Sequence, residues 1–154
     1  MSKRGQWRDG WGVLGVGPGP EAGPGASVEG TAEETVGVTA GGTAGVPVEV
    51  PVEVPVEVAA SYRARTRGLL GRDGIEGAML LTPAASVHTF RMRFAIDVAH
   101  LDHRLTVIAL TTMAPGRLGL PRLRARHVLE AEAGSMAAWG LRVGSALHLR
   151  LNSR

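Results

Sequence analysis

Short apolar runs separated by turn residues fill the second half of the chain, and this pattern predicts a mainly β fold. The runs are rich in β-branched side chains and are broken by prolines, glycines and polar corners. We expect strands over residues 78–82, 86–92, 96–101, 105–112, 124–133 and 145–151. Five or six strands in about 95 residues predict a compact antiparallel β-sandwich or barrel with one modest core.

Two segments between these runs predict short helices. Ser61 can cap a helix that follows it over residues 62–70 and ends at Gly71. Residues 135–140 can form one or two further helical turns. The expected fold class is therefore mainly β with one or two short helices.

The first 57 residues have a different composition. They hold 13 of the 22 glycines and 6 of the 9 prolines, and three basic residues stand against eight acidic ones. A segment with so few large apolar side chains cannot bury enough surface to offset the ordering of its backbone, which costs roughly 1 to 2 kcal/mol per residue. We therefore expect an acidic, disordered tail over residues 1–55 and one domain over residues 56–154.

A four-residue repeat, Pro-Val-Glu-Val, ends this region at residues 46–58. Proline at every fourth position removes a backbone donor, which favours an extended spacer over a paired central strand. Valine at alternate positions still allows residues 56–60 to enter the domain as an edge strand. A proline-rich recognition site is a lesser alternative, because no PxxP motif with adjacent basic residues occurs.

Charge and composition exclude several classes of function. Beyond residue 57 the chain has fourteen arginines against six acidic residues, so the domain is basic. The chain has no cysteine, which excludes disulfides, thiolate zinc sites and cysteine nucleophiles. No apolar window reaches the length of a membrane span and no secretory signal pattern is present, so we expect a cytoplasmic protein. No motif calls for a cofactor, and we expect none.

Five sequence blocks resemble one protein family. In chain order they are GLLGR at 68–72, GAMLL at 77–81, VHTFRMRFAIDVAHLD at 87–102, VLEAEAG at 128–134 and GLRVGSALHL at 140–149. They are similar to blocks of the bacterial and archaeal family named domain of unknown function 192. The resemblance implies a compact, jelly-roll-like β-sandwich, and it brings no settled biochemical role.

Four positions depart from the pattern of that family. Arg91 replaces a usual glycine, and Ala95 replaces a common proline. His100 occupies a usually apolar position, and Ser145 occupies that of a usual aspartate. The resemblance therefore assigns no role to these four residues.

Candidate chemistry gathers on the segment 87–94. If it is a strand, side-chain alternation places His88 on one face with three apolar residues and Thr89 on the other face. The three apolar residues are Phe90, Met92 and Phe94. Two interpretations stay open: His88 is a core residue bonded to the backbone, or it is one polar group of a small apolar ligand pocket.

Two carboxylates, Asp97 and Glu130, lie in expected strands that look buried, where an unpaired charge would destabilise the fold. Arg72 and Arg93 are their expected partners in structural ion pairs. Alternatively, either carboxylate could serve acid–base chemistry with His88, although no hydrolase motif such as GxSxG or HExxH is present.

Two further patterns carry weaker hypotheses. His100 and His103 have the spacing HxxH, but residues three apart in an extended chain face opposite sides, so we expect no metal site. If they lie on a strand, Arg122, Arg124 and Arg126 line one face and could meet the phosphates of a polyanion. Nucleic-acid binding is nevertheless not expected, because aromatic residues for base stacking are scarce.

The sequence therefore predicts a small, non-enzymatic β-domain that binds an unidentified small molecule or protein partner in a pocket near His88. The residues expected to bind the ligand are His88, Thr89, Met92, Arg93, Asp97 and Glu130. Two alternatives remain. One is a hydrolase-like enzyme that uses His88 with Asp97 or Glu130, and the other is polyanion binding through the stripe of Arg122, Arg124 and Arg126.

Overall fold

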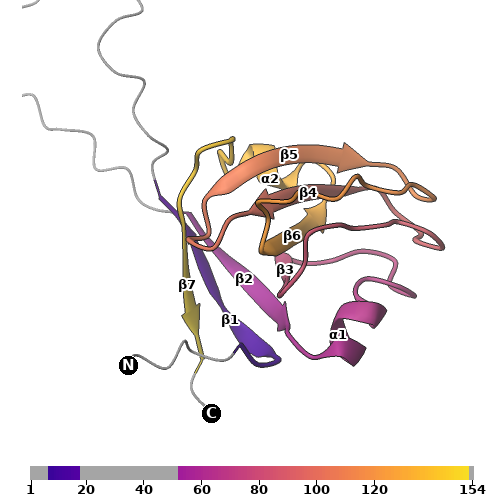
Figure 1. Ribbon diagram of the computed structural model, residues 1–154, viewed down its shortest axis with the longest axis horizontal. Coiled ribbons are helices and arrows are strands. Elements are labelled where there is room, and N and C mark those ends of the chain that lie inside the picture. The colour runs from indigo at the N-terminus through magenta and orange to yellow at the C-terminus, as the bar shows by residue number, and fades with distance from the viewer. Residues whose placement is uncertain (1–6, 18–51, 153–154) are drawn as a thin grey trace, which may run out of the picture.

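The computed structural model describes residues 7–17 and 52–152, and this part of the chain is mainly β, as the sequence predicts (Figure 1). Its strands are β1 Gly10–Val16, β2 Val52–Ala59, β3 Ala78–Leu81, β4 Ile96–Leu101, β5 Val107–Met113, β6 His127–Glu132 and β7 Leu147–Leu151. Its helices are α1 Tyr62–Arg67 and α2 Ser135–Ala138. The structure thus has one strand that the sequence did not predict, β1, and lacks the one expected over residues 86–92.

These strands form a single sheet in the order β5-β4-β6-β3-β2-β1-β7. Five of its six neighbouring pairs are antiparallel, and the β2–β3 pair is parallel. A parallel pair needs a crossover connection, and the segment that contains α1 provides it. The two outer strands approach each other where Thr106 forms an isolated bridge with Ala146. The sheet therefore curls into a partly closed barrel.

β2 is built from the end of the Pro-Val-Glu-Val repeat, and it lies inside the sheet between β1 and β3. This corrects the expectation of an edge strand that starts at residue 56, whereas residues 46–51 of the expected spacer lie outside the described residues. Val54, Val56 and Val58 are buried, whereas Pro55 is exposed. Pro55 stands opposite Val13, and pairing with β3 begins only at Val56. The missing N–H of the proline therefore removes no hydrogen bond to β3.

β1 lies in the stretch that the sequence assigned to a disordered tail. Residues 10–16 pair with β2, residues 12–16 also pair with β7, and Leu14 is fully buried. A Cβ atom at Gly12 would collide with the carbonyl oxygen of Arg150 on β7, so glycine is needed for the close approach of these strands. The glycine content here reflects strand packing. The rest of the expected tail, residues 1–6 and 18–51, lies outside the described residues.

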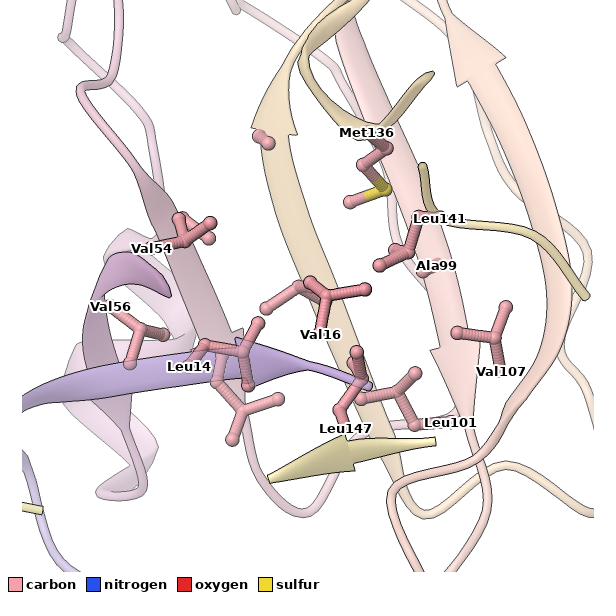
Figure 2. Close-up of a cluster of buried hydrophobic side chains, with 14 of the residues drawn as sticks. Leu14, Val16, Val54, Val56, Ala99, Leu101, Val107, Met136, Leu141 and Leu147 are labelled. Carbon is pink, nitrogen blue, oxygen red and sulfur yellow. The ribbon is translucent and has the colours of Figure 1, made fainter. Parts of the chain in front are cut away.

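An inner apolar cluster fills the barrel (Figure 2). Leu14 of β1, Val56 of β2, Leu101 of β4 and Leu147 of β7 point toward one another, and Met136 of α2 joins them. These residues are almost completely buried. Burial of such a side chain stabilises a fold by about 1.5 to 3 kcal/mol. The inner cluster therefore holds together strands that come from both ends of the described chain.

An outer cluster packs on the opposite face of β3, β4 and β6, where Met79, Val98 and Val128 lie. Leu69, from the turn after α1, and Met92 cover it. Because both faces of these strands are covered, every residue of β3 and β4 is buried. Any polar side chain on them must therefore find a partner inside the protein.

The segment 86–92 is not a strand. His88 forms only an isolated bridge with Leu118, and the chain then turns at Arg91. The φ angle of Arg91 is 61°, in the left-handed region that favours glycine. Before this turn residues 87–90 still alternate, but Thr89 is buried and His88 is exposed, which is the reverse of the expected burial.

Thr89 joins this segment to the loop that follows β5. Its Oγ1 donates a hydrogen bond to the carbonyl oxygen of Ala114 at 2.7 Å and accepts one from the backbone N–H of Arg117 at 2.8 Å. Its carbonyl oxygen accepts from the N–H of Gly116 at 2.7 Å. Thr89 is 0% exposed, so these bonds replace bonds to water.

The predicted stripe of Arg122, Arg124 and Arg126 does not form. These residues precede β6, and the N–H of Ala125 donates to the carbonyl oxygen of Arg122 at 2.9 Å to close a turn. All three arginines are exposed, but in a turn they do not share the single face that a strand would give them.

The helix predictions are confirmed in type, with a difference in length. The hydroxyl of Ser61 accepts a hydrogen bond from the N–H of Ala64 at 3.2 Å and caps α1 as expected. The helix ends at Gly68 and not at Gly71, because Gly68 has a φ angle of 45°. The second helix, α2, lies within the predicted range.

Replacement of Thr89 by valine keeps the shape of the side chain and removes its hydroxyl. We expect a loss of about 2 kcal/mol in the free energy of unfolding, because two backbone groups lose their partner in a buried place. Urea denaturation of the variant measures this loss. Thr111→Val, at an exposed position of β5, is the control and should change stability by less than about 0.5 kcal/mol. Equal losses in the two variants would show that Thr89 does not anchor the loop.

Candidate functional site

A small cavity lies on the outer face of the sheet, between α1 and the segment 86–92. Its volume is about 90 Å³. The helix α1 lies beyond the end of β2, at the lower right of Figure 1. The lining residues come from α1 and the turn after it, the end of β3, the segment 86–92 and β6: Arg65, Thr66, Arg67, Gly68, Leu69, Leu70, Leu81, Ser86, Val87, His88, Met92 and Glu130. We call this cavity the Glu130 pocket.

Glu130 is the carboxylate of this pocket. It lies on β6 directly opposite Met79 on one side and Val98 on the other, and it is 4% exposed. Among the described residues no hydrogen bond or ion pair involves its side chain, and its carboxyl oxygens are not completely closed off from solvent. Burial raises the pKa of the Glu130 carboxyl to about 7. Near neutral pH the group is therefore poised between its protonated and its ionised form.

His88 lies at the edge of the Glu130 pocket. Its side chain is exposed and stacks on Phe90, with the ring centroids 5.2 Å apart and the planes at 21°. Met92, in contrast, is buried in the outer cluster. The structure thus brings together His88, Met92 and Glu130, although through a turn and not through strand alternation.

The other three predicted ligand-binding residues lie elsewhere. Thr89 is occupied by its hydrogen bonds to the loop after β5. Arg93 is exposed and forms an ion pair of 2.8 Å with Asp73. Asp97 lies on the opposite face of the sheet from Glu130, since it stands opposite Ala131 of the inner cluster. None of these three lines the Glu130 pocket.

Asp97 has a structural role at α2. Its carboxylate accepts hydrogen bonds from the N–H of Gly134 at 2.9 Å, the N–H of Met136 at 3.1 Å and the hydroxyl of Thr112 at 2.6 Å. A buried carboxylate with three donors is well satisfied. Asp97 therefore holds the first turn of α2 against β4 and β5.

The ion pairs expected for the buried carboxylates do not form. Arg72 pairs with Glu57 of β2 at 2.9 Å, and Arg93 pairs with Asp73. Asp97 is satisfied by backbone N–H groups, which the sequence could not place next to it. Glu130 receives neither of the expected arginines.

Two arginines of the Glu130 pocket were missed by the sequence analysis. Arg65 and Arg67 come from α1, which approaches β6 only in the folded chain. The guanidinium of Arg65 donates to the carbonyl oxygens of Ala60 and Thr82, which fixes the side chain near the pocket. A signal in the sequence is that α1 has an arginine at every second position, two of them in its last turn.

The other candidates for chemistry are separate in space. His100 is buried and His103 is exposed, so the HxxH spacing does not form a pair of ligands. In the two described ranges no three His, Asp or Glu side chains gather in a way that could hold a metal ion. The described residues form two helices, α1 and α2. Neither is long and apolar enough to cross a membrane.

Comparison with known sequences identifies relatives. A model of the family DUF192, described as "Uncharacterized ACR", matches residues 46–149. A UPF0127 protein of Pyrococcus horikoshii is 33% identical over 81 residues, which cover 49% of this chain and 70% of the relative. A UPF0127 protein of Pyrococcus furiosus is 38% identical over 63 residues, which cover 41% of this chain and 54% of the relative.

Comparison with solved structures shows the same fold in two other proteins. A protein of unknown function from Novosphingobium aromaticivorans has a TM-score of 0.58 at 20% identity, over 64% of this chain and 76% of its own. A candidate transcription regulator from Sinorhizobium meliloti has a TM-score of 0.62 at 16% identity, over 94% of this chain and 98% of its own. At these identities the likeness concerns the fold alone. The family model, which spans more than half of the sequence, shows that this chain belongs to the DUF192 family of uncharacterised proteins.

Proposed function

We propose that this domain binds a small polar ligand in the Glu130 pocket. The observation that carries the proposal is a buried carboxyl group, with no partner among the described residues, in the wall of a cavity. An unpaired buried polar group destabilises a fold, and a ligand that bonds to it offsets this penalty. Half of the residues that line the pocket are polar or charged, which suits a polar ligand.

The size of the pocket limits the ligand. A volume of about 90 Å³ is small beside the roughly 300 to 1,000 Å³ of ordinary ligand pockets. The group that enters therefore has only a few heavy atoms. A small molecule of that size, or one end of a larger molecule, fits this limit.

The charges around the pocket select the kind of group. The guanidinium groups of Arg65 and Arg67 stand against a single carboxyl group, so positive charge prevails at the rim. When Glu130 is protonated, its O–H can donate a hydrogen bond to an oxygen of the ligand. The ligand therefore carries a carbonyl or carboxylate oxygen that enters the pocket toward Glu130.

Binding without catalysis fits the geometry better than a reaction does. Both His88 and Glu130 line the pocket, but no hydrogen bond between them is found in the described part of the chain. A catalytic dyad of a base and its orienting group works through such a bond. The hydrolase-like alternative with Asp97 is still less favoured, because Asp97 lies on the other face of the sheet.

Glu130→Gln should remove a pH dependence of stability. In the native protein the pKa of Glu130 is raised to about 7 from an ordinary value of 4.5. The contribution of this carboxyl group to the free energy of unfolding is therefore greatest below pH 4.5, and it is lost as the pH rises through 7. The free energy of unfolding should fall by about 3 kcal/mol over this range. Urea denaturation between pH 4.5 and pH 8 should show a fall in the native protein relative to the glutamine variant. Glu132→Gln, at the exposed end of the same strand, is the control and should retain the fall.

Ligand binding should depend on the protonation of Glu130. We expect acetate or acetamide to raise the melting temperature of the native protein at pH 6 more than at pH 8, because protonated Glu130 donates to their oxygen atoms. Thermal-shift measurements on the Glu130→Gln variant should lose this difference between the two pH values. Ser86→Trp, which places a large side chain in the pocket wall, should abolish the shift.

The control ligand is ethylamine, which has a similar size and the opposite charge. A larger shift with ethylamine than with acetate or acetamide would contradict the proposed ligand class. Equal shifts in the native protein and in Ser86→Trp would show that these ligands bind elsewhere.

A further inference from the structure

A second and larger cavity lies on the outer face of β4 and β5, under the loop that follows β5. Its volume is about 450 Å³, within the range of small-molecule sites. Val98 and His100 of β4 form its floor, since they share the outer face of the strand. It shares no lining residue with the Glu130 pocket.

His100 is the unexplained polar group of this cavity. It is 5% exposed, and neither of its ring nitrogens has a hydrogen-bond partner in the described part of the chain. Burial, with a smaller effect of the nearby Arg122 charge, lowers the pKa of His100 below its ordinary value. The ring is therefore neutral at pH 7, with one nitrogen that can donate a hydrogen bond and one that can accept. A native protein seldom leaves both nitrogens unpaired.

The charge of the cavity wall has one sign. Arg117 and Arg122 line it, and no Asp or Glu does. Neither guanidinium forms an ion pair with a described residue. The cavity therefore attracts an anion.

The mouth of the cavity is apolar. Leu118 and Leu120 line it and remain 70% and 77% exposed. When a ligand covers large apolar side chains that are this exposed, the removal of their surface from water favours binding. An apolar portion of the ligand can therefore pack against the two leucines.

The loop that follows β5 and carries Arg117, Leu118 and Leu120 is held in place by hydrogen bonds to the segment 86–92. Thr89 bonds to Ala114 and Arg117, and the N–H of Gly119 donates to the carbonyl oxygen of Val87 at 2.8 Å. A Cβ at Gly119 would lie only 2.8 Å from that same oxygen, so the contact has no room for a larger residue. The wall is thus formed before any ligand arrives, which lowers the entropy lost on binding.

We propose that this cavity binds an amphipathic monocarboxylate. The carboxylate lies between Arg117 and Arg122. The ring nitrogens of His100 are closed off from solvent in this structure, so a rotation of the ring brings its N–H to the carboxylate, which accepts the hydrogen bond. The apolar part of the molecule packs on Leu118 and Leu120. This site is independent of the Glu130 pocket, because the two are lined by different residues.

Isothermal titration of the full chain with octanoate tests the site. We expect His100→Leu and Arg122→Gln each to weaken octanoate binding at least about tenfold, because each removes a hydrogen-bond donor to a charged group. Leucine is chosen at position 100 because it has a similar volume and removes two unpaired nitrogens, so the variant should fold. His103→Leu and Arg124→Gln, at exposed neighbouring positions, are the matched controls and should bind as the native protein does.

A second readout locates the ligand. In the native protein with ¹⁵N-labelled histidine, octanoate should shift the imidazole nitrogen signals of His100 and leave those of His103 unchanged. Octylamine, which has the opposite charge, should bind at least about tenfold more weakly than octanoate.

Three results would each overturn the proposal: no binding of octanoate at millimolar concentration, equal affinity of the native protein and His100→Leu, or octylamine binding as tight as that of octanoate. Binding of a peptide through its terminal carboxylate, without binding of octanoate, would also overturn the small-molecule ligand and assign the cavity to a protein partner. The test does not involve Glu130, so it stands or fails separately from the function proposed for the Glu130 pocket.

Discussion

Burial of both faces of the central strands is the constraint on which the rest of this structure depends. The inner cluster fills the barrel on one face of β3, β4 and β6, and the outer cluster covers the other face. Every residue of β3 and β4 is consequently buried. The loops and α1, which close over the outer face, are held there by this apolar packing and by the hydrogen bonds of Thr89. Polar side chains on these strands need hydrogen-bond partners inside the protein. The buried polar residues that lack such a partner among the described residues therefore mark the candidate sites.

Three polar residues meet this constraint in different ways. Asp97 faces the inner side and receives three hydrogen bonds, two of them from backbone N–H groups at α2. Glu130 and His100 face the outer side, where neither finds a partner among the described residues, and each lines a cavity. The carboxyl group responds to burial with a raised pKa and the imidazole with a lowered one, so both groups favour their neutral form. Asp97 is structural because its carboxylate has hydrogen-bond partners. Glu130 and His100, which have none among the described residues, are the candidates for binding.

Residue types and spacing predicted a good part of this arrangement. Ser61 followed by a helical pattern is a local signal, and the helix begins there because the cap needs only neighbouring residues. The apolar runs that became β3, β4 and β6 were found because their composition does not depend on the partner strand. The segment around His88 was assigned to the wrong conformation, because a left-handed residue at Arg91 has no signal in an apolar alternating pattern. The same limit applies to β1, where glycines that permit close strand packing resemble those of an unstructured segment.

The sequence by itself determined that the chain is mainly β, that its apolar runs carry His88, Met92 and the carboxylates Asp97 and Glu130, and which family it resembles. These properties follow from local propensity and from residue identity. The tertiary structure alone decided that Glu130 shares a pocket with His88 while Asp97 does not, because that depends on the strand order and on which face each residue occupies. It also decided that Arg65 and Arg67 approach the pocket and that His100 has no hydrogen-bond partner among the described residues. Contacts between residues far apart in the chain arise only when the sheet closes, and no local pattern encodes which of them will form.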